Sequence, residues 1–482
     1  MQNKFDLIII GAGPGGYVSA IRAAQLGLKV AIVESTHLGG ICLNWGCIPT
    51  KALLKCSEVN HLLHNLDSYG FSAKEIAFDF EKIIARSRNV AKTLSNGIAS
   101  LLKKNKIEVI NGFASFKNKN QINVANNNEN QVFEANYFII ATGARARIIP
   151  GFEPDETHIW TYRQAMVPTK LPKSILVVGS GAIGVEFASF YKQMGSEVIL
   201  VEMAEQILPV EDAEIAKLAS QNFEKQGIKI HTKTTVDSIK KTANSVIATL
   251  RTPEKTPEKT QEKTQEKTQE IEVEKIIMAV GIIANTENIG LENTQIKLEN
   301  GRIAINQHCN TAEPNIYAIG DVVAGPWLAH KASHEASIAA ESIASKMGKY
   351  NPKKLHTLNI NNIPGCTYSF PQIASIGITE KKAKELNLKV KIGKFPYQAN
   401  GKAIAIGETF GLIKVIFAEE TGELLGAHLI GADATEMIQV FAVAKQAELT
   451  EAELMQTVFA HPTLGEMLHE AVLSAYGQAI HF

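Results

Sequence analysis

A glycine-rich pattern between two apolar segments constrains the fold of this chain more than any other feature. Residues 5–10 fit a buried parallel strand, a helical pattern then runs to Leu26, and a second apolar run ends at Glu34. Three glycines stand at the first turn: Gly11, Gly13 and Gly16. In a βαβ unit such glycines make the tight turn, admit a pyrophosphate and let the helix pack on the strand, while the acid binds a ribose. This segment therefore predicts a dinucleotide site.

The same pattern recurs near the middle of the chain. The apolar run 174–178 precedes Gly179, Gly181 and Gly184, and the next strand ends at Glu202. From the first glycine to the acid is 23 residues in both copies, and this matched spacing predicts two dinucleotide sites. Residues 203–208 contain no arginine or lysine that could hold a 2′-phosphate, so the second site favours NAD over NADP.

Two further apolar runs end in glycine turns, at Gly143 and Gly281, and are expected to close the two nucleotide-binding sheets. A third run, residues 316–320, leads into Asp321. An aspartate there can bind a polyol hydroxyl, or it can cap the helix that follows. Ligand binding is the favoured interpretation.

Cys42 and Cys47 stand just after the first nucleotide unit. Two thiols so close in sequence can open and close as a disulfide with little backbone movement, and a helix N-terminus with a nearby lysine, Lys51, favours the thiolate that exchange requires. The other interpretation is a structural disulfide or two unrelated buried cysteines. Only three other cysteines occur, and they are scattered, so the redox interpretation is preferred.

The last hundred residues change character, from strand patterns over 389–395, 411–417 and 423–430 to helical patterns from Thr435 onward. Near the end, Glu466 follows His461 at a distance of five residues. Thiol exchange needs a base that titrates near neutral pH, which suits histidine, and a carboxylate can fix the tautomer of its ring. Alone the pair is a weak signal, but beside the cysteines it predicts an acid/base dyad.

Composition excludes several classes of function. Basic and acidic residues balance at 49 each, so no charge excess points to nucleic acid, and no apolar run approaches the roughly 18 residues that cross a membrane. A length of 482 residues predicts roughly three domains. A strand pattern from Phe5 leaves no room for a leader, and the few cysteines fit a reducing compartment. The cytoplasm is the expected location, and a processed organellar protein remains an alternative.

Residues 252–270 form a four-residue repeat, TPEKTPEKTQEKTQEKTQE. Glutamates recur at i, i+4, prolines interrupt the start, and there is no apolar face, so a helix is disfavoured. The expectation is a solvated, mobile insertion without chemistry, in a hairpin between strands near 246–250 and 271–277.

The motifs together resemble a known family. GAGPGGY, GGICLNWGCIPTKALL, ATGA, GSGAIGVEFAS, NIYAIGDV, LAHKA and AHPTLGE occur in the order seen in the class I flavin-dependent pyridine nucleotide-disulfide oxidoreductases, most closely in the lipoamide branch. The resemblance implies an α/β fold with two Rossmann-like dinucleotide-binding domains and an α+β C-terminal dimerisation domain. It implies an FAD-binding domain over 1–149, an NAD-binding domain over 150–282, a segment completing the FAD site over 283–350 and an interface domain over 351–482.

The resemblance also implies roles for individual residues. FAD would lie on Gly11, Gly13, Gly16, Glu34 and Asp321, and NAD on Gly179, Gly181, Gly184 and Glu202, with Gly143 and Gly281 also touching the cofactors. Lys51 would lie near the flavin and pair with Glu186. Cys42 would exchange with substrate and Cys47 would face the flavin. His461 and Glu466 would reach the site from the other subunit of a homodimer, and no metal is implied.

The implied activity is the oxidation of protein-bound dihydrolipoamide to lipoamide with NAD⁺. The implied partners are a lipoyl domain of a 2-oxo acid dehydrogenase complex or the glycine cleavage H protein, and the peripheral-subunit-binding domain of the complex core. Neither nucleic acid nor a membrane is implied. Rival interpretations are a reductase of another disulfide or of a metal ion, and a bound subunit with a mainly structural role.

The chain departs from the family pattern at several places. Trp45 stands where a small aliphatic residue is common, Thr50 replaces serine, and Gly465 stands where serine is common and could loosen the His–Glu turn. Residues 279–285 lack the Arg and Pro often found after Gly281, so the resemblance does not specify the NAD contacts there. None of these changes removes a predicted catalytic group.

Overall fold

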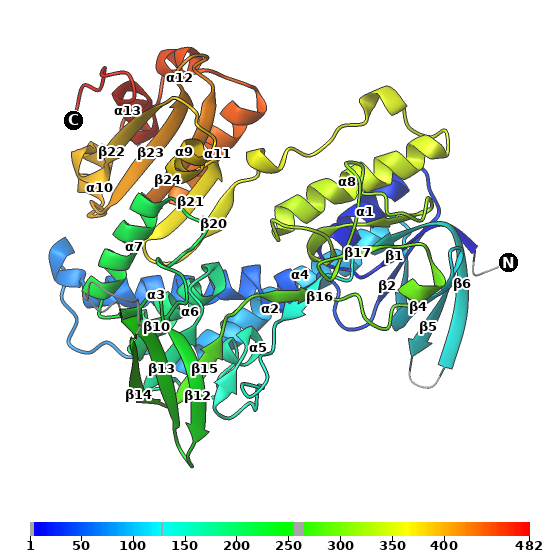
Figure 1. Ribbon diagram of the computed structural model, residues 1–482, viewed down its shortest axis with the longest axis horizontal. Coiled ribbons are helices and arrows are strands. Elements are labelled where there is room, and N and C mark those ends of the chain that lie inside the picture. The colour runs from blue at the N-terminus through cyan, green and yellow to red at the C-terminus, as the bar shows by residue number, and fades with distance from the viewer. Residues whose placement is uncertain (1–3, 127–128, 255–264) are drawn as a thin grey trace. The chain divides into compact units, whose positions relative to one another are not determined.

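The computed structural model describes residues 4–126, 129–254 and 265–482, which form two compact units (Figure 1). The first unit combines Met1–Ala52, Lys82–Arg147 and Ile282–Ile360. The second combines Leu53–Glu81, Ile148–Gly281 and Asn361–Phe482. Each unit has its own hydrophobic cores. No helix among the described residues is both long enough and apolar enough to cross a membrane.

The first predicted nucleotide fold forms the sheet of the first unit, in the order β3-β2-β1-β6-β5-β4, with β19 beside β6. Its strands are β1 (Lys4–Ile10), β2 (Val30–Glu34), β3 (Glu108–Asn111), β4 (Phe113–Asn118), β5 (Gln121–Asn126), β6 (Glu129–Ile140) and β19 (Ile316–Ala318). β1, β2, β3 and β19 run parallel to their partners, whereas β4 and β5 form an antiparallel meander against the first half of β6. The runs ending at Gly143 and Asp321 thus join this sheet, as predicted for the first of them.

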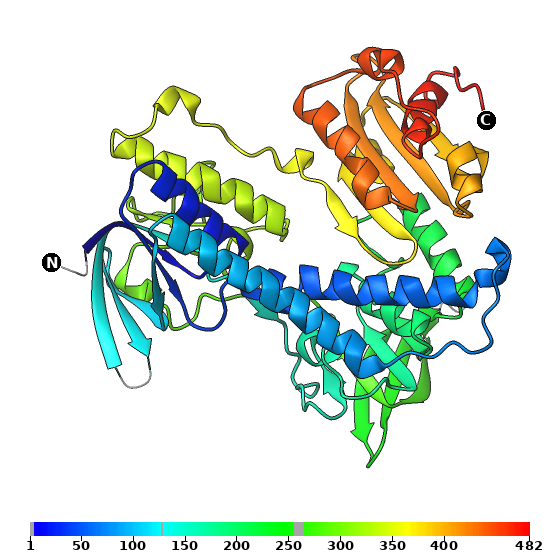
Figure 2. The same ribbon diagram turned by 180° about the vertical axis from the view of Figure 1, so that it is seen from behind.

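Two helices, α1 (Pro14–Gln25) and α8 (Ala329–Lys346), lie side by side against this sheet in both views (Figures 1 and 2). Their contact is rich in alanine, including Ala20, Ala23 and Ala336, so the backbones approach closely. Arg22 of α1 also donates to the buried carboxylate of Glu341 in α8, with Nη2 2.6 Å from Oε1. This packing fixes the direction of α1, whose N-terminus follows the glycine turn.

The second nucleotide fold lies in the second unit as an all-parallel sheet, in the order β11-β10-β9-β15-β8. Its strands are β8 (Ile159–Trp160), β9 (Ser174–Val178), β10 (Glu197–Val201), β11 (Lys229–His231) and β15 (Lys275–Met278), and its helices are α5 (Tyr162–Ala165), α6 (Ala182–Gln193) and α7 (Ala213–Lys225). β15 leads to Gly281 and pairs with β9, so this run closes the second sheet as predicted.

An antiparallel sheet of β12 (Thr235–Lys241), β13 (Val246–Glu254) and β14 (Gln265–Val273) carries the repeat segment. The predicted hairpin between the strands near 246–250 and 271–277 is confirmed, but the expectation of a mobile insertion over 252–270 is wrong at both ends, because Thr252 pairs with Lys267 and Glu270 with Thr249 in register. Thr favours a strand, whereas Glu, Lys and Pro disfavour one, so the composition of the repeat does not predict these strands, and the pairing between β13 and β14 determines them. Residues 255–264 of the insertion lie outside the described residues.

The C-terminal region is an antiparallel sheet in the order β20-β21-β24-β23-β22. Its strands are β20 (Gly365–Thr367), β21 (Gln372–Gly377), β22 (Val390–Pro396), β23 (Gly411–Ala418) and β24 (Leu424–Gly431), and its helices are α9 (Glu380–Glu385), α10 (Gly401–Ala405), α11 (Ala434–Gln446), α12 (Glu451–Gln456) and α13 (Glu466–Ser474). α11 and α13 cover one face (Figure 2), where Ile413 and Val415 of β23 join their core. The side chain of Lys414, between them in sequence, points to the other face.

Candidate active site

The two cysteines stand on consecutive helices of the first unit. Cys42 lies in α2 (Gly40–Trp45), and Cys47 is the first residue of α3 (Cys47–His64), the position at which a helix N-terminus favours a thiolate. Both are thiols in this structure. A hydrogen bond with Cys47, then burial, raises the pKa of the Cys42 thiol, while Lys51 lowers it in part. Burial and the neighbouring sulfur thus both disfavour the thiolate of Cys42.

The cysteine segment is attached directly to the first glycine-rich loop. Gly39 N–H donates to the carbonyl of Ala12 at 2.8 Å, and a Cβ on Gly40 would stand 2.7 Å from Cα of Gly13. Gly39 and Gly40 both have positive φ, +89° and +58°, and this conformation lets the segment lie so close to the loop. The redox pair is thus built next to the first predicted nucleotide site.

The first nucleotide site has the geometry that the fingerprint predicts. A Cβ on Gly16 would stand 1.9 Å from the Gly11 carbonyl oxygen, which explains why only glycine fits, whereas a Cβ on Gly13 meets nothing within 4 Å. Glu34 accepts hydrogen bonds from Ala12 N at 2.7 Å and Thr36 N at 2.8 Å. Its carboxylate is therefore oriented, and the space over Gly13 is open to a ligand.

The second site repeats this arrangement. A Cβ on Gly184 would stand 1.9 Å from the Gly179 carbonyl oxygen, and Gly181 faces open space. The buried Glu202 accepts from Ser180 N at 2.9 Å and Ala204 N at 2.8 Å. The same two contacts, one to the residue after the first glycine and one two residues beyond the acid, orient both carboxylates. Both sites thus fit a dinucleotide on their backbone geometry.

Asp321 lies in a short 3-10 helix, Gly320–Val322, and does not cap the helix that follows, because α8 begins at Ala329 with Leu328 as its cap residue. Burial raises the pKa of this carboxyl, and its carboxylate makes no hydrogen bond to any described residue. A partly buried carboxyl that has Lys331 nearby and no hydrogen bond to a described residue suits a ligand hydroxyl.

Sequence reasoning missed two buried charges beside Asp321. Lys331 lies 2.8 Å from Glu335, whose carboxylate accepts from Gly320 N at 2.8 Å. Lys331 stands within the LAHKA motif, which was the only signal for it. Gly143 and Gly281 have positive φ, and no atom lies within 4 Å of a Cβ built on either, so both positions leave room for a ligand.

The predicted dyad forms in the second unit. Nδ1 of His461 lies 2.9 Å from Oε1 of Glu466, and Thr463 N donates to the other oxygen at 2.9 Å. Burial opposes ionisation of Glu466, but the hydrogen bonds from Thr463 and His461 prevail and lower the pKa of this carboxyl. The turn is held although Gly465 replaces the usual serine. Nε2 of the exposed imidazole points away from the carboxylate and is available for proton transfer.

The predicted residues divide between the two units. The cysteines, Lys51 and the first fingerprint belong to the first unit, whereas the second fingerprint and the dyad belong to the second. Glu186 is buried in α6 and accepts from Tyr368 N at 2.9 Å. Its pairing with Lys51, and the approach of His461 to the cysteines of another subunit, stay predictions.

Comparison with known proteins identifies the fold. Residues 5–336 match the family described as pyridine nucleotide-disulphide oxidoreductase, and residues 363–472 match its dimerisation domain, which supports the predicted homodimer. Two solved structures are similar to this chain. LpdA from Mycobacterium tuberculosis has a TM-score of 0.86 and 26% sequence identity, and the match covers 97% of this chain and 98% of LpdA. The Cu(II) complex of the HOCl-induced flavoprotein disulfide reductase RclA from Escherichia coli has a TM-score of 0.84 and 27% identity, and the match covers 98% of this chain and 99% of RclA.

Curated relatives align over the full length of both chains. Proteins named dihydrolipoyl dehydrogenase are 50% identical in Zymomonas mobilis, 46% in Rhizobium etli and 41% in Bacillus subtilis, each over 100% of this chain and of the relative. These matches confirm the predicted fold class and the predicted resemblance. FAD and NAD, the predicted cofactors, are those that this family uses. The chain belongs to the pyridine nucleotide-disulphide oxidoreductase family.

Proposed function

We propose that this protein is a dihydrolipoamide dehydrogenase, which oxidises protein-bound dihydrolipoamide to lipoamide and reduces NAD⁺ to NADH. The observation that carries the proposal is the thiol pair, Cys42 in hydrogen-bond reach of Cys47 at the start of α3, attached to the first nucleotide loop. The 50% identical relative with the name dihydrolipoyl dehydrogenase supports the choice of substrate.

The residue roles belong to the same proposal. The loop of the first unit, with Glu34 and Asp321, would hold FAD, and the loop of the second unit, with Glu202, would hold NAD. The division of the chain into 1–149, 150–282, 283–350 and 351–482 follows these assignments. The open space over Gly13 and Gly181 and the free carboxylate of Asp321 support them.

The reaction with the substrate thiols uses the Cys42–Cys47 pair and the His461–Glu466 dyad. His461 takes the proton of one substrate thiol, and Glu466 stabilises the imidazolium that results. The substrate thiolate attacks Cys42 of the Cys42–Cys47 disulfide and displaces Cys47, which leaves as a thiolate near Lys51. The second substrate thiol then displaces Cys42, which takes up a proton. Two substrate thiols and one protein disulfide become lipoamide, the Cys42 thiol and the Cys47 thiolate, and the other substrate proton is held by His461.

FAD held by the first loop, with Glu34 and Asp321, would supply the two-electron chemistry that links the Cys42–Cys47 pair to NAD⁺ held by the second loop. The protein orients both nucleotides through backbone N–H groups and the carboxylates of Glu34 and Glu202. On the family resemblance, Cys47 would face the flavin and Cys42 would face the substrate.

The natural substrate of such an enzyme is a lipoyl group on a carrier protein. The proposed partners are therefore a lipoyl domain of a 2-oxo acid dehydrogenase complex or a glycine cleavage H protein, together with the peripheral-subunit-binding domain of a complex core. The cytoplasm is the proposed location, on the low cysteine content of the sequence.

The test is a comparison of acceptors with the FAD-loaded protein. NADH oxidation should be rapid with lipoamide and at least a hundredfold slower with oxidised glutathione, and NADPH should not replace NADH. A preference for glutathione or for NADPH would contradict the proposal. Cys47→Ser should abolish turnover of lipoamide while FAD stays bound.

A further inference from the structure

The segment between the two cysteines carries a contact that the proposed mechanism does not use. Trp45 is the last residue of α2, and the guanidinium carbon of Arg88 in α4 (Phe80–Lys104) lies 4.6 Å from the centre of its ring. Nε and Nη2 of Arg88 are buried without a hydrogen-bond acceptor among the described residues. The cation–π contact with Trp45 therefore offsets the cost of removing these guanidinium nitrogens from water.

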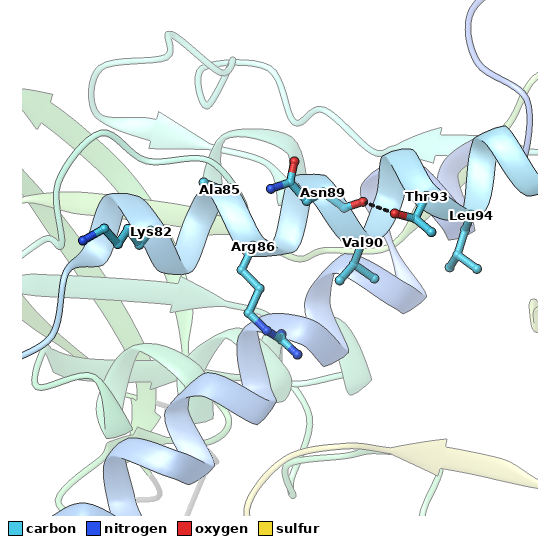
Figure 3. A pocket seen from close by; sticks show the side chains of 7 residues that line it. All are labelled: Lys82, Ala85, Arg86, Asn89, Val90, Thr93 and Leu94. Atoms are coloured by element: carbon cyan, nitrogen blue, oxygen red, sulfur yellow. Dashed lines mark hydrogen bonds between the residues drawn. The ribbon is translucent and has the colours of Figure 1, made fainter.

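Helix α4 holds both helices of the redox segment. On the α2 side, Ser95 Oγ donates to Asn44 Oδ1 at 3.0 Å. On the α3 side, Ser87 Oγ donates to the carbonyl of Pro49 at 3.2 Å, and Arg86 Nη1 donates to the carbonyl of Ala52 at 3.1 Å. Figure 3 shows Arg86 extending from α4 toward the neighbouring helix, beside a groove of about 570 Å³. Arg88 acts between these contacts, where α2 meets α3.

This junction decides how the two sulfur atoms meet. Only Gly46 separates Trp45, the last residue of α2, from Cys47, and it has φ −147° and ψ −117°, outside the helical region. A Cβ on Gly46 would stand 3.1 Å from the Ile41 carbonyl oxygen, so the turn is tight as well as conformationally permissive. Fixing the ring of Trp45 removes freedom from the turn before the disulfide closes, which raises the effective concentration of one thiol at the other.

We propose that Arg88 is a positioning residue for the redox reaction, which holds the Cys42–Cys47 pair in its closing geometry by stacking on Trp45. The inference rests on the proposed role of the two cysteines. Loss of the stack should favour the dithiol over the disulfide about tenfold, which corresponds to a rise in reduction potential of about 30 mV.

The test is a redox titration of the FAD-loaded enzyme without NAD⁺ and without oxygen. Wild type and Arg88→Gln are equilibrated in mixtures of lipoamide and dihydrolipoamide, quenched with acid and alkylated, and labelling of Cys42 and Cys47 is measured by mass spectrometry. Arg88→Gln and Trp45→Val should each shift the midpoint about tenfold, and the double variant should shift it no further, since the contact between Arg88 and Trp45 is already lost in either single variant. Arg88→Lys, which keeps a cation over the ring, should fall between.

Lys92 supplies the matched control, because it lines with Arg88 and Trp45 a second groove of about 260 Å³. Lys92→Gln removes a charge from this groove but no stack, and its midpoint should stay within twofold of wild type. A midpoint for Arg88→Gln within twofold of wild type, an equal shift in Lys92→Gln, or additive shifts in the double variant would overturn the inference.

Two further comparisons keep the result decisive. If Arg88→Gln does not bind FAD or shows no thermal transition, Trp45→Phe is measured instead. Its redox midpoint should shift two- to threefold from wild type, because a smaller aromatic ring remains under Arg88. If Cys42 and Cys47 never form a disulfide in wild type, the proposed function itself has failed, whereas equal midpoints in wild type and variants remove only the role of Arg88.

Discussion

Lys414 is buried at the centre of a charge cluster, and its replacement by methionine is expected to destabilise the second unit strongly. Its side chain is 1% exposed, and Nζ lies 2.9 Å from Asp212, 2.9 Å from Glu380 and 3.1 Å from Glu214. Burial opposes the charge, but the carboxylates prevail and raise the pKa of Lys414 to about 12. Removing one member of a buried ion pair lowers the free energy of unfolding by about 3–5 kcal/mol. Because Glu214 and Glu380 are partly exposed, the expected loss for Lys414→Met is about 3 kcal/mol, at the low end of this range.

The loss should depend on pH in a defined way. The pKa values of Asp212 and Glu380 are lowered in the folded protein, so the stability they contribute is present above their ordinary pKa and lost as the pH falls through the lowered one. The pKa of Lys414 is raised, so its contribution is full below its ordinary value and lost as the pH rises through about 12. The difference between wild type and Lys414→Met should thus be greatest from about pH 5 to 10 and shrink in acid.

The assay is the thermal transition of the FAD-loaded protein at pH 7 and at pH 4. A loss of about 3 kcal/mol corresponds to a fall in Tm of about 5 °C for a unit of this size, if the second unit unfolds on its own. Lys394→Met is the control, since Lys394 makes a single bond to Glu214 at 2.8 Å with a side chain 43% exposed, and such pairs contribute about 0–1 kcal/mol. A fall in Tm no larger for Lys414→Met than for this control would show that the cluster does not stabilise the unit.

Three other predictions test separate parts of the structure. Burial raises the pKa of Glu211 to about 7, so Glu211→Gln should raise the free energy of unfolding by about 2–3 kcal/mol at pH 8. Denaturant titration should find no such gain at pH 4, where the carboxyl is protonated in the folded protein. A gain at both pH values would point to another cause. Gly184→Ala should lower Tm and abolish NADH binding, because the Cβ of the new alanine would collide with the Gly179 carbonyl oxygen. Gly181→Ala should weaken NADH binding and leave Tm unchanged, because its Cβ would meet no protein atom. Equal Tm values for the two variants would refute the packing argument. His461→Ala should slow reduction by dihydrolipoamide about 10²–10⁴-fold in stopped-flow measurements but leave reduction by NADH unchanged, and a wild-type rate with dihydrolipoamide would remove its role.

The features that sequence predicted correctly depend on residues that are near one another in the chain. The strand, glycine turn, helix and acid of each nucleotide fold lie within one βαβ unit, and His461 finds Glu466 five residues away. Local backbone geometry therefore determines them, and a spacing pattern contains most of the information.

The features that sequence missed join residues that are far apart. Lys414 meets an aspartate 202 positions earlier, and Arg88 meets Trp45 only because α4 packs on α2. No periodicity encodes such contacts. The prediction for the two ends of the repeat segment is wrong for a related reason. These ends are strands because β13 and β14 pair with each other, not because of the composition of the repeat.

The central claim is that Cys42 and Cys47 carry electrons between dihydrolipoamide and NAD⁺. It is tested most directly by mixing the FAD-loaded protein with dihydrolipoamide without NAD⁺ and oxygen, trapping new thiols by alkylation, and then adding NAD⁺ to a parallel sample. New label is expected at Cys42 and Cys47 and none at Cys56, Cys309 or Cys366, and the new label should be lost as NADH forms. NADH formation with Cys42 and Cys47 unchanged throughout would contradict it.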